Sequence, residues 1–194
     1  MAADSERYAL DPGWIARLRQ GDEAAFAEVY NREKSVVYTF VLRLSRDPSV
    51  AADLFQNVWL KLARHASTLR DDSNLRAWLL TVARREYLSF RRAQALDLSR
   101  LLVLGLAQNE PAEHPADSDA RALGAALDQL SDADREVLLL CAGSGLDSAA
   151  LAATLGISGV ALRKRLARAR QRLAERLDAE AEEPRPHVAT KGAR

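Results

Sequence analysis

The stretch LDSAALAATLGISGVALRKRLARARQRL, residues 146–173, decides the fold of this chain. It predicts a short helix over 148–155, a tight turn at 155–158 and a long helix that begins near Ser158. Gly156 can adopt the positive φ with which a chain leaves a helix. Ser158 is a favourable N-cap for the helix that follows. This order of elements is typical of a helix-turn-helix.

The long helix separates apolar from basic residues when its positions are placed at about 100° per residue. One side is apolar and is made of Leu162, Leu166, Ala169, Leu173 and Leu177. The opposite side is cationic and carries Lys164, Arg165, Arg168, Arg172 and Arg176. Residues 158–177 hold seven basic residues against one acidic residue, which favours a polyanionic partner. A solvated surface helix without a partner is the alternative interpretation.

The rest of the chain is also helical in its apolar spacing, and it contains no convincing period-2 strand. Helices are predicted over about 12–20, 22–45, 50–64 and 75–92, with Asp11 and Asp22 as N-caps and a polar loop over 67–74. The first four helices can bury one shared core as a bundle. Two further helices, over about 120–130 and 132–142, precede the helix-turn-helix.

The composition shifts between the two helical parts. The segment NEPAEHPADSD, residues 109–119, contains two prolines and four acidic residues, as a flexible, self-repelling linker does. The predicted organisation is a first domain over 12–92, a linker over 93–121, a second domain over 122–177 and a disordered tail over 178–194. The apolar run LLVLGL, residues 101–106, is predicted to be a short docking helix or a partner-binding segment.

Composition excludes several classes of protein. The 194 residues are 48% hydrophobic and 28% charged, with a net charge of +1, an ordinary globular mixture. The longest apolar stretch, 101–107, is far shorter than a membrane span, and no signal peptide is recognisable. A single cysteine, Cys141, and three scattered histidines predict no disulfide, no metal site and no cofactor. No enzyme motif is found, so we expect a non-enzymatic protein in a cytoplasmic, reducing setting.

Two segments resemble one known family. Residues 20–92, through QGDEAAFAEVY (20–30), AADLFQNVWLKLARH (51–65) and LRAWLLTVARREYLSFRR (75–92), are similar to region 2 of the extracytoplasmic-function (ECF) sigma factors of bacterial RNA polymerase. Residues 122–177 resemble region 4 of the same family through LDQLSDADREVLLL (127–140), LGIS (155–158) and RKRLARARQRL (163–173). The resemblance implies an all-α fold of two small helical domains joined by a flexible linker.

The resemblance also implies a function: binding core RNA polymerase, recognising and melting promoters, and starting transcription. Its implied partners are the β′ clamp helices and β flap of the polymerase, the −35 and −10 promoter elements, and an anti-sigma factor, with no membrane. Asp53 and Gln56 match a DxxQ pattern that contacts the clamp, with Asn57 on the same face. The implied −10 contacts are Leu69, Arg70, Asn74, Arg84, Arg85, Ser89, Arg91 and Arg92. The implied −35 contacts are Ala161, Arg163, Lys164, Arg165, Arg168 and Arg172.

The chain departs from the family pattern at several positions. Ser131 stands where proline is frequent, Arg85 where asparagine is common, and Asn57 where glutamate is common. The recognition helix begins Gly159-Val160-Ala161-Leu162 in place of the common Glu-Gly-Thr-Val, which removes a hydroxyl that could contact phosphate or base. Two other functions stay open at this point. One is a stand-alone helix-turn-helix regulator, and the other is a diverged sigma-like adaptor that has lost DNA binding.

Overall fold

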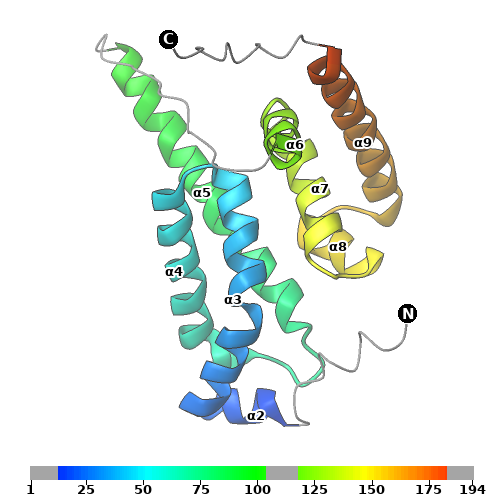
Figure 1. Ribbon diagram of the computed structural model, residues 1–194. Helices are drawn as coiled ribbons and strands as arrows, with labels where there is room; N and C mark the ends of the chain where they lie inside the picture. Colours follow the sequence, from blue (N-terminus) through cyan, green and yellow to red (C-terminus); the bar gives the residue numbers. More distant parts are fainter. Residues whose placement is uncertain (1–12, 104–117, 183–194) are drawn as a thin grey trace, which may run out of the picture.

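A computed structural model describes residues 13–103 and 118–182, and Figure 1 shows these described parts as helices without strands. Four α-helices and one short 3-10 helix precede the gap: α2 (Trp14–Arg19), α3 (Glu23–Ser45), α4 (Pro48–His65), η1 (Ala66–Thr68) and α5 (Leu75–Val103). Four helices follow it: α6 (Ser118–Asp128), α7 (Asp132–Gly143), α8 (Ser148–Leu155) and α9 (Gly159–Glu182). We call α2–α5 the N-terminal bundle and α6–α9 the C-terminal bundle.

Side-chain caps start the helices of the N-terminal bundle. The carboxylate of Asp22 accepts from the amides of Ala24 and Ala25 at 2.8 and 3.1 Å, as predicted. Asp47 caps α4 in the same way, and Pro48 occupies the first turn, where its missing N–H costs nothing. The predicted start of this helix at residue 50 is therefore too late.

The core of the N-terminal bundle lies between α3, α4 and α5, which pack against one another. Aromatic side chains of α3 and α4 form a cluster in edge-to-face contact, made of Phe26, Tyr30, Tyr38, Phe55 and Trp59. Such edge-to-face pairs stabilise a core beyond the area that they bury. The clustering fixes which faces of α3 and α4 are buried and which are left to solvent.

The C-terminal bundle contains the predicted helix-turn-helix. Gly156 follows α8 in the left-handed conformation, with φ of 69°. The hydroxyl of Ser158 then accepts from the amide of Ala161 at 3.2 Å and caps α9. Both predictions for this turn are confirmed, and α8 spans the predicted 148–155.

Three further predicted boundaries are wrong. α2 begins at Trp14 after a left-handed Gly13, and the expected cap Asp11 lies outside the described residues. α5 does not end at 92 but continues through Val103, because residues 93–103 are mostly good helix formers without glycine or proline. α9 likewise runs past 177 to Glu182. Of the apolar run 101–106, the first three residues end α5 and the others lie outside the described residues.

The two bundles pack against each other. α7 lies against α3 and also against α9, and α8 lies against α5, so that α7 stands between the N-terminal bundle and α9 (Figure 1). One cluster of buried apolar side chains runs through both bundles, from Val37 and Phe40 of α3 to Val137 and Leu140 of α7. We call the contact between the bundles the seam. The sequence predicted two domains but gave no indication of this contact.

Candidate nucleic-acid interface and polymerase-binding surface

The α9 helix presents its basic residues to solvent. Leu162 and Ala169 are buried in the C-terminal bundle, with Leu166, Leu173 and Leu177 partly buried beside them. The side chains of Arg163, Lys164, Arg168, Arg172 and Arg176 are exposed, and Arg165 is half-buried. The predicted division of α9 into an apolar side and a cationic side is confirmed. Ala161 is also exposed, at the capped end of the helix.

One residue of the cationic face is also tied to α7. The guanidinium of Arg172 donates to the carboxylate of Asp134, which is 5% exposed. Ser131 caps α7 by accepting from the Asp134 amide at 3.2 Å, and its hydroxyl donates to the same carboxylate at 2.8 Å. Burial opposes ionisation of Asp134, but the hydrogen bonds from Ser131 and Arg172 and the charges of Arg172 and Arg165 hold its pKa below the ordinary value.

The basic residues of α5 lie on two different faces. Arg85, Ser89 and Arg92 are exposed on one face, with Arg92 donating to the Ser89 hydroxyl at 3.1 Å. Arg84 and Arg91 are seven residues apart, so that they share another face, rotated by about 100° from the first. This second face meets α7. Arg84 is half-buried on this second face, whereas Arg91 faces α7 but is exposed.

Carboxylates of α7 pair with both arginines at the seam. Nε of Arg84 lies 2.8 Å from Oε1 of Glu136, and Nη2 of Arg91 lies 3.4 Å from Oδ2 of Asp132. Glu136 is 5% exposed. Burial raises the pKa of Glu136, and the opposing charge of Arg84 offsets only part of that effect. A buried carboxylate of this kind needs its cationic partner to remain ionised.

The loop before α5 holds the other predicted −10 residues. Leu69 is 4% exposed and belongs to the core, so the prediction that it contacts DNA is wrong. Arg70 is exposed and pairs with Asp72 through Nε at 3.1 Å. Asn74 is exposed, and its side-chain oxygen accepts from the Ala77 amide at 3.0 Å, which caps α5.

A cavity lies beside this loop. It has a volume of about 260 Å³ and is lined by residues from the end of α4, from η1 and from α5, including Thr68, Trp78 and Arg85. Trp78 was expected in the core and is partly buried there. The structure thus brings an aromatic ring and a guanidinium together at a recess next to the exposed face of α5.

The three predicted polymerase contacts share one surface. Asp53, Gln56 and Asn57 are all exposed on α4. The opposite side of α4 buries Leu54 and Val58 in the core. The tested part of this prediction, that these polar residues face away from the apolar stripe, is confirmed.

The sequence reasoning missed the residues that close the seam. Glu136, Asp132 and Arg135 were never singled out, nor was Arg76, whose Nη1 donates to the Ser144 carbonyl across the seam at 3.1 Å. The S-x-x-D spacing of Ser131 and Asp134 is a recognisable capping signal. No local pattern indicates the partner of Glu136, because Arg84 is distant in the sequence.

None of the described helices is long and apolar enough to cross a membrane. Within the same residues, no group of three or more His, Cys, Asp or Glu side chains is arranged to hold a metal ion.

Two models of known protein families match this chain. Residues 29–96 match the model of sigma-70 region 2, and residues 120–173 match that of sigma-70 region 4. A helix-turn-helix behind a region 2 bundle, in this order, defines a sigma-70-type transcription factor.

Similar sequences and solved structures show which sigma-70-type factors this chain resembles. The ECF RNA polymerase sigma factor SigK of Mycobacterium bovis is 31% identical over 139 residues, which cover 68% of this chain and 74% of SigK. SigK of Mycolicibacterium vanbaalenii is 28% identical, over 78% of this chain and 81% of that protein. The sigma factor RpoE of Bartonella quintana, solved with the anti-sigma factor NepR, has a TM-score of 0.71 and 29% identity, covering 80% of this chain and 98% of RpoE. CnrH, solved with the cytosolic domain of CnrY, has the same fold, with a TM-score of 0.66 and 24% identity over 88% of this chain and 98% of CnrH.

The chain belongs to the ECF RNA polymerase sigma factors. It directs RNA polymerase to promoters and supports initiation, and it is not itself an enzyme. The family assignment favours this function over the stand-alone regulator and the adaptor.

Proposed function

We propose that the surfaces described above divide the work of a sigma factor between the two bundles. Residues 12–92 bind the β′ clamp helices and the −10 element, residues 122–177 bind the −35 element and the β flap, and residues 93–121 connect them. The observation that carries the proposal is the exposed cationic face of α9, set on a capped helix-turn-helix.

The −35 element is assigned to α9. A helix that enters the major groove with its N-terminus first brings its first two turns to the base edges. Ala161, Arg163, Lys164 and Arg165 occupy these turns, and arginine and lysine pair well with guanine. Arg168 and Arg172 follow on the cationic face and are assigned to phosphates, which fix the register without reading sequence.

The −10 element is assigned to the exposed face of α5 and the cavity beside it. Arg85, Ser89 and Arg92 face solvent together, and Arg70 and Asn74 lie on the adjoining loop. The cavity of about 260 Å³ offers the Trp78 ring and the Arg85 guanidinium to an unstacked base. Stacking and cation–π contacts offset the cost of extruding a base from the duplex.

The polymerase clamp is assigned to Asp53, Gln56 and Asn57 on α4. Their exposure leaves one carboxylate and two side-chain amides available to a partner on a helix held rigid by the core. We further propose an anti-sigma factor as a partner, by similarity to RpoE and its complex with NepR. The apolar run 101–106 is a candidate for that contact, and its last three residues lie outside the described residues. Purification of this protein that recovers polymerase but no second partner would count against the proposed anti-sigma factor.

The test is reconstituted transcription followed by sequencing of RNA 5′ ends. Core polymerase with this protein should start at discrete genomic promoters. The variant R163A/K164A/R165A should lose about 10- to 100-fold of that output, since each base contact contributes about 1–3 kcal/mol. The variant K34A/R43A/R64A removes three exposed cations from the N-terminal bundle and should change the promoter output little. Binding of core polymerase without initiation at any promoter would refute the proposal.

A further inference from the structure

A large apolar side chain is exposed at the start of the recognition helix. Val160, in the first turn of α9, is 54% exposed. Nine residues separate it from the fully buried Ala169, so that Val160 points about 180° away from the core of the C-terminal bundle. The valine therefore contributes little to the packing of the bundle, and it is a weaker helix former than alanine. Val160 is not among the predicted −35 contacts.

Basic side chains border this valine on the helix surface. At about 100° per residue, Arg163 and Lys164 lie within about 60° of Val160, one turn further along α9. Both side chains are exposed, and the exposed Ala167 continues the same face by another turn. An apolar group between two cations on one helix face must meet the partner that the cations meet.

The surroundings of Val160 favour DNA over a protein as that partner. Single exposed apolar side chains are common on protein surfaces, so exposure alone indicates no partner. The core of a protein–protein interface is depleted of charged residues. Val160 instead has Arg163 and Lys164 beside it, and these cations complement a phosphate backbone.

The major groove offers an apolar group at its base edges, the 5-methyl of thymine. Val160 precedes Arg163 and Lys164 by about 4.5 and 6 Å along the helix axis. This distance corresponds to one or two base pairs, since each base pair rises by about 3.4 Å. Glycine is common at the position of Val160 in the family, so a valine contact there is particular to this chain.

We propose that Val160 determines part of the −35 specificity by packing against the 5-methyl group of a thymine. This thymine lies one or two base pairs from the positions that Arg163 and Lys164 contact. Cytosine, adenine and guanine present polar groups without a methyl at their major-groove edges, and a valine side chain cannot pair with them. The inference rests on the proposed contact between α9 and the −35 element.

Promoter mapping gives the first test. Core polymerase is loaded with the wild type or with V160A, and RNA 5′ ends from genomic DNA define the −35 elements that each protein uses. The wild-type elements should share a thymine that V160A no longer requires, while the other −35 positions stay the same. V160A should fold at least as well as the wild type, because alanine is the better helix former. Wild-type elements without a preferred thymine, or an unchanged preference with V160A, would overturn the proposal.

Replacing thymine by uracil isolates the methyl group. Each −35 thymine of a mapped promoter duplex, on either strand, is replaced in turn by deoxyuridine, which lacks only the 5-methyl. Binding of the polymerase holoenzyme to each duplex is measured by fluorescence anisotropy. One replacement should weaken binding by the wild type about fourfold, as expected for one methyl group returned to water. V160A should bind the thymine and uracil duplexes equally, and a fourfold uracil penalty that persists with V160A would overturn the proposal.

The matched control is K164A, at the neighbouring exposed position. It should weaken binding to both duplexes and keep the uracil penalty. An equal loss on both duplexes with V160A would mean that the valine contacts something other than the methyl, which also overturns the proposal. If R163A/K164A/R165A binds promoters as the wild type does, the assignment of α9 to the −35 element fails and the role of Val160 fails with it. If that triple variant loses binding while V160A keeps the penalty, only the inference about Val160 fails.

Discussion

Three consecutive charged residues of α7, Asp134, Arg135 and Glu136, are all buried. Successive helical residues point about 100° apart, so each of the three faces a different neighbour. Asp134 meets α9, Glu136 meets α5, and Arg135 donates to the carbonyls of Leu127 and Leu130 at the end of α6. Charges buried in a row are costly unless each has its own partner, and the position of α7 between three elements supplies one for each.

Arg135 is the most buried of the three, at 2% exposure. It also donates to the Leu44 carbonyl at 3.4 Å, in the last turn of α3. The last carbonyls of a helix lack partners within that helix, and Arg135 supplies donors to those of α3 and α6. Burial lowers the pKa of Arg135, with the nearby charge of Arg46 adding to the effect.

We predict that R135M destabilises the protein by about 3 kcal/mol, since it removes the buried guanidinium that donates to the carbonyls of Leu44, Leu127 and Leu130. Urea unfolding followed by circular dichroism measures the change. R64M, at an exposed position of α4, should stay within about 0.5 kcal/mol of the wild type. A midpoint for R135M that matches that of R64M would show that water or neighbouring groups satisfy these carbonyls.

Asp134 predicts a pH dependence. Its pKa is lower in the folded protein than its ordinary value of 3.8, so the folded state binds this proton less readily than the unfolded state. The resulting stability is present above the ordinary value and is lost as pH falls through the folded pKa. D134N should cost about 1 kcal/mol at pH 7 and should flatten the loss of stability below about pH 5.

The measurement is a series of urea titrations from neutral to acid pH, with D178N on the exposed end of α9 as control. The control should retain the wild-type slope. Parallel curves for the wild type and D134N would mean that other carboxylates carry the acid sensitivity.

At the scale of elements, the turn between α8 and α9 sets the direction of the recognition helix. The amides of Gly156 and Ile157 donate to the carbonyls of Ala153 and Ala152 at 3.1 and 3.0 Å. This pattern closes a helix only with a residue in the left-handed conformation. A Cβ added at Gly156 would meet nothing within 4 Å, so that its cost is backbone strain alone.

We predict that G156A lowers the free energy of unfolding by about 1 kcal/mol and weakens binding of a −35 duplex several-fold. G143A is the matched control, because a Cβ there also meets open space and alanine favours the last turn of α7. Unfolding curves and fluorescence anisotropy measure the two effects. Equal losses for the two variants would contradict the argument from φ.

The helices themselves were largely predictable from the sequence, because caps and apolar spacing are local signals. Asp22, Gly156 and Ser158 acted where expected. The end of α5 was misplaced, since weaker periodicity after residue 92 was read as a linker although the residues favour a helix. Leu69 was included among the −10 contacts because the resemblance implied a contribution from the loop before this helix, whereas the loop turns that side chain into the core.

At the scale of the whole molecule, the sequence predicted two bundles and the candidate residues on each, but not the contact between them. Arg84 was selected for its charge and its place on a basic helix, and both properties fit DNA and Glu136 equally well. Distinguishing the two needs the position of α7, which depends on the packing of Phe40 and Leu140 far apart in the chain. A single sequence therefore does not indicate that Arg84 pairs with Glu136.

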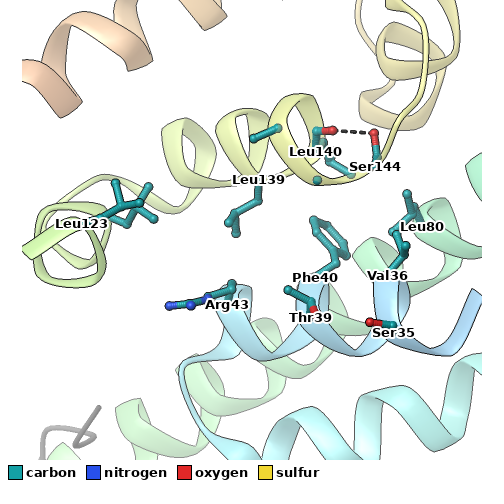
Figure 2. A pocket seen from close by; sticks show the side chains of 13 residues that line it. Ser35, Val36, Thr39, Phe40, Arg43, Leu80, Leu123, Leu139, Leu140 and Ser144 are labelled. Carbon is teal, nitrogen blue, oxygen red and sulfur yellow. Dashed lines mark hydrogen bonds between the residues drawn. The ribbon is translucent and has the colours of Figure 1, made fainter. Parts of the chain in front are cut away.

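A cavity of about 450 Å³ at the seam, between α3, α6 and α7, predicts the effect of a larger side chain at its lining (Figure 2). Leu139 lines it from α7 and is partly buried, so L139F adds apolar contact between the bundles. Cavity filling commonly stabilises a protein by about 0.5–2 kcal/mol. Residues of both bundles line the cavity, so this gain depends on the contact between them. L139F should therefore raise the urea midpoint of unfolding.

The control is L60F, the same substitution at a position of α4 that is 44% exposed and lies outside the cavity. It should change the midpoint little. A midpoint for L139F no higher than that of L60F would show that the added ring does not fill the cavity between the bundles.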